Sequence, residues 1–188
     1  MVSEVSICNM ALTRIGQSRI TSLDQSGVLA ELSKLYYEAT LNELLSAYEW
    51  PFAIARVQLS ASALDNLSVY DNMYQLPTSV LRVLTMLSDE DYSDLTDKWE
   101  IEGDKLFSDT TPAYIKYIST MPNPTKLPQP FVEALYLRIA SKMVVKITQD
   151  QSLMAGIFQE YSVAFQTAIA VIGGNSQSKP VDKIWWTA

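Results

Sequence analysis

The chain has 188 residues, of which 48% are hydrophobic and 19% are charged, a composition typical of a globular domain with a sizeable core. It contains no histidine, which excludes Ser-His-Asp catalysis, Cys-His catalysis and every histidine-ligated metal site. The one cysteine, Cys8, excludes an intramolecular disulfide and a cysteine-based zinc site, and a net charge of −7 argues against nucleic-acid binding over the whole surface.

Two helices are predicted in the N-terminal part of the chain. Ser3 is a candidate N-cap, the apolar residues that follow recur at helical spacing, and Gly16 is a typical stop. A second helix is expected to begin near Gly27 and to end at Pro51, because the residue before a proline avoids the helical region. Its predicted buried stripe, wide enough for contact on two sides, comprises Leu29, Leu32, Tyr36, Ala39, Glu43 and Ala47, broadened by Val28, Leu35, Leu44 and Leu45.

The middle of the chain changes to short extended segments. The strongest local signal is a hairpin from Trp99 to Phe107, in which a Gly103-Asp104 turn places Ile101 opposite Leu106. Further strands are predicted at residues 56–59, 70–76, 81–87 and 113–118.

Prolines between residues 122 and 130 mark the return to helix, and Pro128 or Pro130 fits a first helical turn. A last helix is expected from about Asp150 to Gly173. No charged residue occurs between Glu160 and Lys179, so we expect this helix to be mostly covered, by its own chain or by a neighbour. The residues predicted to be buried together are Leu12, Leu32, Leu44, Leu135, Ile139 and Phe165.

These elements predict an α+β fold, in which N- and C-terminal helices form a bundle with an inserted antiparallel β-rich region and an extended C-terminal tail. The expected divisions are residues 1–52, 53–120, 121–174 and 175–188. The longest weakly polar stretch is too short for the roughly 20 apolar residues that a bilayer requires, so no membrane span is predicted. The N-terminus lacks the features of a signal peptide, so synthesis in a cytoplasm is expected.

Two charged features stand out. The segment Asp89–Asp104 holds eight acidic residues against one lysine. It is either a solvated loop and hairpin edge, or an acidic surface that is kept clear of DNA or directed at a basic partner; the EF-hand spacing is absent. The second feature is a basic stripe of Arg138, Lys142 and Lys146, four residues apart on one predicted helix. The stripe is either solvated or meets an acidic face of another subunit or phosphates.

The sequence gives little support for catalysis or for a cofactor. It contains neither a P-loop nor a dinucleotide-binding fingerprint. Acidic pairs are present, but their spacing does not define a glycosidase dyad. We therefore predict that the protein is not an enzyme and uses no cofactor or metal.

The C-terminal residues Ile184, Trp185 and Trp186 follow a polar linker that begins at Asn175. Adjacent tryptophans without a helix or strand of their own either fold back onto the core or anchor in another protein, where tryptophan is a favoured interface residue. The linker has few apolar groups and is expected to be flexible in the free protein.

Three segments carry a resemblance to a known family: Ile7–Gly16, the Glu49–Phe52 corner and Tyr74–Arg82. Together with the tryptophan-rich end, they resemble the tail tubular protein A family, the head-to-tail adaptors (connector proteins) of short-tailed, podovirus-type phages. The resemblance runs over most of the chain and carries no catalytic signature.

The resemblance implies a virion protein at the head-to-tail junction. Its copies would form a twelve-subunit ring between the portal protein and a tail nozzle of the tubular protein B type, and would extend a channel through which genomic DNA passes without sequence-specific binding. The family's C-terminal segment is associated with the portal. Arg138, Lys142 and Lys146 are candidates for contacts between subunits or with DNA in the channel. Two alternatives stay open: a head-completion or neck protein of another tail type, and a tail-associated wall-degrading hydrolase. The portal-docking tail implied here contains Lys179, Pro180, Val181, Ile184, Trp185 and Trp186.

Overall fold

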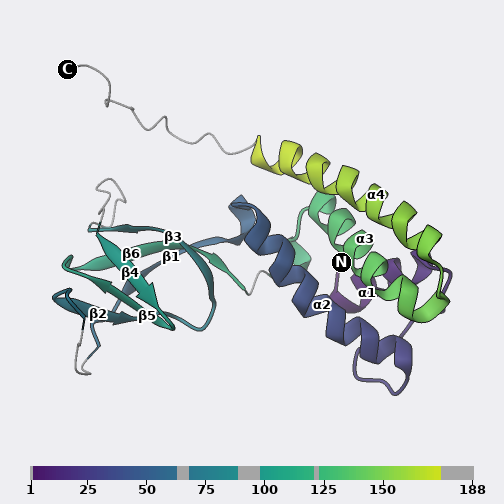
Figure 1. Cartoon of the computed structure of the whole chain (residues 1–188), viewed down its shortest axis with the longest axis horizontal. Coiled ribbons are helices and arrows are strands. Elements are labelled where there is room, and N and C mark those ends of the chain that lie inside the picture. Colours follow the sequence, from purple (N-terminus) through teal and green to yellow (C-terminus); the bar gives the residue numbers. More distant parts are fainter. Residues whose placement is uncertain (1, 63–67, 89–97, 121–122, 175–188) are drawn as a thin grey trace. The chain divides into compact units, whose positions relative to one another are not determined.

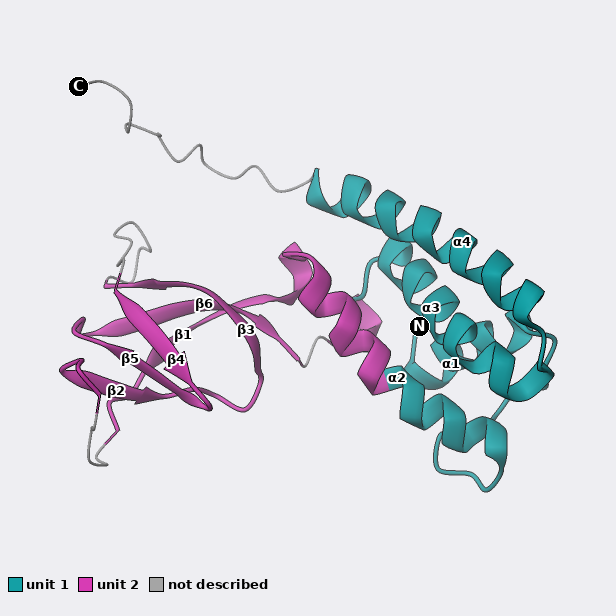
Figure 2. Cartoon of the chain, in the orientation of Figure 1, with its two compact units in different colours: residues 1–37, 127–188 teal, residues 38–126 magenta. Residues whose placement is uncertain are grey.

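The computed structural model describes residues 2–62, 68–88, 98–120 and 123–174 (Figure 1). Four α-helices and two small antiparallel sheets make up this described part, which confirms the α+β class. The chain divides into two compact units: residues 1–37 with 127–188 form unit 1, and residues 38–126 form unit 2 (Figure 2). The division between the two units falls within the second helix, between residues 37 and 38. The strands span Ile54 to Ser119, inside the expected β-rich segment 53–120.

Local sequence signals define the first helix, α1 (Glu4–Arg14). The Ser6 amide donates to the Ser3 hydroxyl at 3.2 Å, and the Ser3 amide donates to the Ser6 hydroxyl at 2.7 Å. This reciprocal capping box satisfies amides that the first turn leaves without partners. Gly16 follows with φ of +72°, a conformation that glycine adopts without steric cost, so both predicted ends of α1 are confirmed.

The second helix, α2 (Val28–Ala47), buries a side that shares only Leu44 and Leu45 with the predicted stripe. Of the predicted stripe, Ala39, Glu43 and Ala47 are exposed, while Leu29, Leu32 and Tyr36 are only partly buried. The helix carries apolar residues on more than one side, so periodicity alone could not choose between its sides. The residues that α2 does bury are Ala30, Ser33, Tyr37, Thr40, Leu41, Leu44 and Leu45.

The C-terminal helices are α3 (Gln129–Thr148) and α4 (Gln151–Ala168), and a π-helical turn (Ile169–Gly173) extends α4. Between them Gln149 adopts a left-handed conformation with φ of 57°, and the Asp150 carboxylate caps α4 by accepting from the Leu153 amide at 2.8 Å. Helix α3 packs against both α1 and α4.

The predicted common core is partly wrong. Leu12, Leu135 and Ile139 in unit 1 are fully buried, as is Leu44 in unit 2, but Leu32 and Phe165 are partly exposed. Helix α4 buries only Ile157 and Ala168 completely, although it is one of the most apolar segments of the chain. Within the described part of the chain, much of α4 is therefore uncovered.

An aromatic corner follows α2 in unit 2. Trp50 is fully buried, and its indole N–H donates to the Leu44 carbonyl at 2.7 Å. The ring centroid of Trp50 lies 5.1 Å from that of Tyr48 and 5.9 Å from that of Phe52. The helix ends at Ala47, before Pro51, which opens a short 3₁₀ turn (Pro51–Ala53) leading into the first strand.

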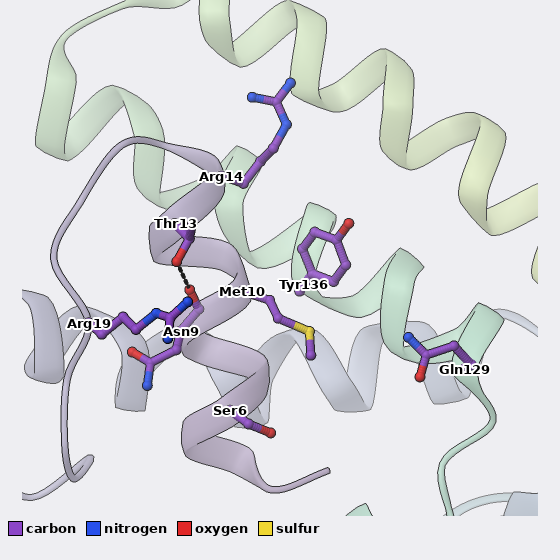
Figure 3. Close-up of a pocket in the computed structure, with 8 residues that line it drawn as sticks. All are labelled: Ser6, Asn9, Met10, Thr13, Arg14, Arg19, Gln129 and Tyr136. Atoms are coloured by element: carbon purple, nitrogen blue, oxygen red, sulfur yellow. Dashed lines mark hydrogen bonds between the residues drawn. The ribbon is translucent and has the colours of Figure 1, made fainter. Parts of the chain in front are cut away.

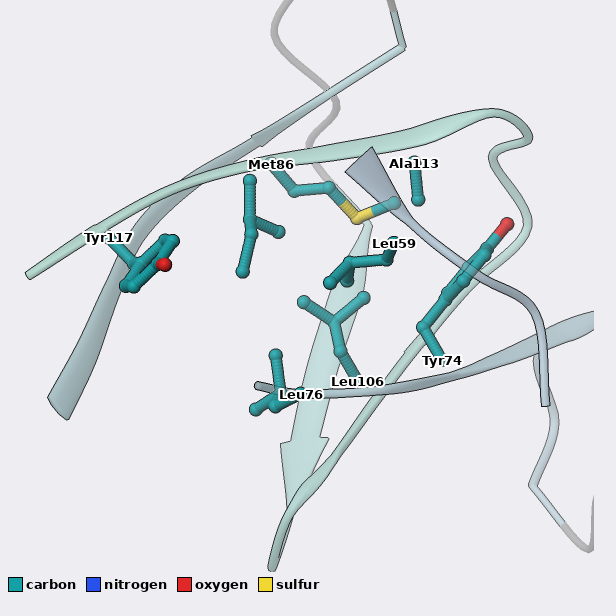
Figure 4. Packing of buried hydrophobic residues seen from close by; sticks show 8 residues of the cluster. Leu59, Tyr74, Leu76, Met86, Leu106, Ala113 and Tyr117 are labelled. Atoms are coloured by element: carbon teal, nitrogen blue, oxygen red, sulfur yellow. The ribbon is translucent and has the colours of Figure 1, made fainter. Parts of the chain in front are cut away.

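Two three-stranded antiparallel sheets form the rest of unit 2, in the orders β1-β6-β3 and β2-β5-β4. Residues of both sheets share one apolar cluster, in which Met86 and Ile115 of the first sheet join Tyr74 and Leu106 of the second (Figure 4). The hairpin register pairs Ile101 with Leu106, as predicted, around Gly103. The strands are β1 (Ile54–Leu59), β2 (Asn72–Gln75), β3 (Val80–Leu87), β4 (Trp99–Glu102), β5 (Lys105–Ser108) and β6 (Ala113–Ser119).

Candidate assembly surfaces

A shallow groove of about 630 Å³ lies between α1 and α3 in unit 1 (Figure 3). The α1 residues that line it share the side of the helix opposite to its buried residues, and Gln129 and Tyr136 contribute from α3. The residues lining the groove are Ser6, Asn9, Met10, Thr13, Arg14, Arg19, Gln129 and Tyr136.

Most polar groups of this groove already serve the local structure. The Thr13 hydroxyl donates to the Asn9 carbonyl at 2.7 Å, as Figure 3 shows. The Asn9 side chain makes two hydrogen bonds to the backbone of Ile20. Its Nδ2 donates to the Ile20 carbonyl at 2.9 Å, and its Oδ1 accepts from the Ile20 N–H at 2.8 Å. The Ser6 hydroxyl belongs to the capping box. These groups hold α1 and the loop that follows it, so they are poor candidates for chemistry on a substrate.

An ion pair connects α1 to α4 at the edge of the groove. Arg14 donates to both carboxylate oxygens of Glu160, from Nε at 3.0 Å and from Nη2 at 2.5 Å. The hydrogen bond from Arg14 lowers the pKa of Glu160 below its usual value, and Glu160 in turn raises the pKa of Arg14. Glu160 also lines a second hollow, of about 460 Å³, which shares Tyr136 with the first. The paired side chains are partly exposed, so the contribution to stability is small.

The predicted basic stripe lies on α3, beside an aromatic row on α4. The Arg138 guanidinium carbon lies 5.4 Å from the ring centroid of Phe158 and 5.2 Å from that of Tyr161. Tyr161 is 5.7 Å from both Phe158 and Phe165, measured between ring centroids. Such contacts are typical of cation–π pairs. Lys142 is partly exposed and Lys146 is exposed, and both lie between Arg138 and the turn that leads into α4.

The outer side of α2 is the other conspicuous surface of unit 1. Val28 is 63% exposed and Leu35 is 64% exposed, values that are high for large apolar side chains in a helix. On the buried side, the hydroxyls of Ser33 and Tyr37 have no hydrogen-bond partner within the described part of the chain. Burial raises the pKa of Tyr37 above its usual value. Helix α2 therefore buries hydroxyl groups while it leaves large apolar groups in solvent.

The acidic segment and the predicted docking tail are described only in part. Glu100, Glu102 and Asp104 are exposed in and beside the hairpin, and residues 89–97 lie outside the described residues. The tail residues Lys179, Pro180, Val181, Ile184, Trp185 and Trp186 also lie outside them.

Comparison with protein-family models and with curated proteins finds no match for this chain. Within residues 2–62, 68–88, 98–120 and 123–174, no group of three or more acidic or cysteine side chains could hold a metal ion. Over the same residues, no helix combines the length and hydrophobicity that crossing a membrane requires.

Cys8 is expected to be chemically inert in the folded protein. It is fully buried on α1, and burial raises the pKa of its thiol to about 12. Because the thiolate is the reactive form, a thiol-specific reagent at pH 8 should label native protein at a negligible rate. Labelling should become rapid in urea, where the pKa returns to about 8.5. The absorbance of the coloured thiolate that the reagent releases measures both rates. Fast labelling of native protein would contradict the burial of Cys8.

The sequence did not identify three features of these surfaces. The groove side of α1 could have been found from the helical spacing of Ser6, Asn9, Met10 and Thr13, since these residues share one side. The Arg14–Glu160 pair joins residues that are 146 positions apart, which no local pattern indicates. The outward position of Leu35 could not be distinguished from burial because the apolar stripe was so wide.

Proposed function

We propose that this protein is a structural virion protein, a head-to-tail adaptor whose copies form a ring between a portal and a tail nozzle. The ring would extend the DNA channel and support genome retention and ejection. The observation that carries the proposal is the pair of uncovered apolar helix surfaces in unit 1, on α2 and on α4. Surfaces of this kind mark protein interaction sites, and an assembly subunit needs them on more than one side.

The residues that carry the family resemblance support the same proposal. Ile7–Gly16 contains most of α1, Glu49–Phe52 forms the corner between α2 and β1, and Tyr74–Arg82 joins β2 to β3. The first segment is most of a helix together with its glycine stop, and the other two segments connect consecutive elements. A resemblance located in such positions is one of architecture, and the architecture it implies is a helical bundle with an inserted β-rich region.

In this proposal the partners are further copies of the chain, the portal protein, the tail nozzle and the passing DNA. DNA would be conducted without sequence-specific contacts, which agrees with a net charge of −7. The protein would act without an active site or cofactor, in the virion.

Deleting residues 181–188 tests the proposal through the docking tail. The shortened chain should keep the circular dichroism of the full chain and should bind the isolated portal at least about tenfold more weakly, the equivalent of 1.4 kcal/mol. Surface plasmon resonance on immobilised portal measures the affinity. A double variant, Trp185→Ala with Trp186→Ala, separates the loss of the rings from the loss of chain length.

The outcomes also separate the competing functions. Full-affinity portal binding by the shortened chain would place the docking surface elsewhere, and no binding by the full chain would overturn the adaptor proposal. A head-completion or neck protein of another tail type would bind a different joint of the virion. A wall-degrading hydrolase would clear peptidoglycan in a zymogram.

A further inference from the structure

Two helix surfaces have complementary properties, one on α2, which belongs to unit 1 up to residue 37, and one on α3 and α4 of unit 1. The first, the α2 face, consists of Val28, Leu32, Leu35 and Ala39 with Glu31 and Glu38 beside them. The four apolar residues are spaced by four, three and four positions, the repeat of a helix that packs along a second helix. Val28, Leu35 and Ala39 are exposed and Leu32 is partly exposed. The α2 face is therefore an apolar seam with two glutamates along one edge.

The second surface, the α4 face, consists of the aromatic row Phe158, Tyr161 and Phe165 with the basic row Arg138, Lys142 and Lys146. The cation–π contacts of Arg138 with Phe158 and Tyr161 join the two rows at this point. Phe158 is 43% exposed. On α3, Val145 lies seven positions after Arg138, on the same side of the helix, and is 39% exposed. The α4 face is therefore aromatic and apolar with a basic flank.

The charges of the two faces are opposite in sign and extend over similar lengths of helix. Glu31 and Glu38 are seven positions apart on α2, which corresponds to about 10 Å along the helix axis. Arg138 and Lys146 are eight positions apart on α3, which corresponds to about 12 Å. Each face would meet unfavourable like charges if it paired with itself, and opposite charges if it paired with the other.

We propose that the α2 face of one copy of this chain docks on the α4 face of a second copy. The inference deepens the proposed function, because it names the contact through which copies would join into a ring. Within unit 1, α1 and α3 separate the first part of α2 from α4 (Figure 1). A copy can therefore use both faces at once. A contact between two different surfaces, repeated from copy to copy, closes into a ring or grows into a filament.

Charge reversal on each face tests the pairing without a portal. One variant carries Glu31→Lys with Glu38→Lys, and the other carries Lys142→Glu with Lys146→Glu. Either variant alone presents like charges on both sides of the contact, so its self-association at low salt should fall at least about tenfold. An equimolar mixture should associate as the unchanged chain does, because every face then finds a partner face of opposite charge on the other variant. Sedimentation velocity over a concentration series measures all of these.

A third variant is the matched control. Lys98→Glu with Lys105→Glu makes the same change of charge in and beside the hairpin of unit 2, at residues that belong to neither face, and should leave association unchanged. Salt near 1 M should reduce the difference between the variants, since it screens charges beyond about 3 Å. Circular dichroism checks that each variant is folded.

The contradicting outcomes are specific. An unchanged chain that stays monomeric at a concentration on the order of 1 mM overturns the inference, because the contact would then be weaker than about 4 kcal/mol. A mixture that associates no better than either variant alone also overturns the inference. The two faces would then belong to other partners. If the unchanged chain self-associates as expected but does not bind the portal, the proposed function alone is overturned. If it binds the portal but does not self-associate, this inference alone is overturned.

Discussion

Replacing Trp50 with alanine should destabilise the protein by about 3–5 kcal/mol. The side chain is fully buried between Tyr48 and Phe52, so truncation removes a large apolar surface and leaves a cavity. It also removes the hydrogen bond to the Leu44 carbonyl. That carbonyl belongs to the last turn of α2, whose carbonyls have no partner within the helix. Urea titration followed by circular dichroism measures the change.

Trp50→Phe separates the two contributions. The phenyl ring keeps most of the apolar contact and lacks the indole N–H, so the loss should be about 1–3 kcal/mol, the cost of one buried unpaired carbonyl. Equal losses for the two variants would show that packing at this corner contributes little. A loss below about 0.5 kcal/mol for Trp50→Ala would contradict the buried position of the ring.

Replacing Leu135 with alanine should cost about 2–5 kcal/mol. Leu135 is fully buried on α3, the helix that packs against both α1 and α4. A cavity at this position therefore weakens the centre of unit 1. The same urea titration measures the change, and the slope with denaturant should stay the same if only stability is affected.

Val145→Ala on the same helix is the matched control. Val145 is 39% exposed, so its truncation should change the stability of the isolated chain by no more than about 0.5 kcal/mol. Similar losses for Leu135→Ala and Val145→Ala would mean that the assigned buried side of α3 is wrong.

The local elements of this fold were predictable because they depend on near neighbours in the chain. The capping box of Ser3 and Ser6, the glycine stop at Gly16 and the Asp150 cap each act over about three residues. The hairpin around Gly103 follows from turn chemistry and alternation over nine residues, Trp99 to Phe107. The same short-range signals predicted the change from helix to strand and back, and hence the α+β class.

The buried side of α2 was decided by tertiary structure. Both sides of this helix carry apolar residues, so periodicity predicts a wide stripe and cannot rank Leu35 against Leu44. In the fold Leu44 is fully buried, and Leu35 is 64% exposed while the hydroxyl-bearing Ser33 and Tyr37 are buried. A helix with this composition exposes apolar groups whichever side it buries.

The candidate surfaces divide in the same way. The sequence by itself determined that Arg138, Lys142 and Lys146 share one side of a helix, since their spacing is helical. Only tertiary packing placed Arg138 over Phe158 and Tyr161, and Arg14 against Glu160, because these pairs join different helices. Helical spacing specifies directions around one axis, whereas contacts between helices depend on how side chains of several elements fill a common space.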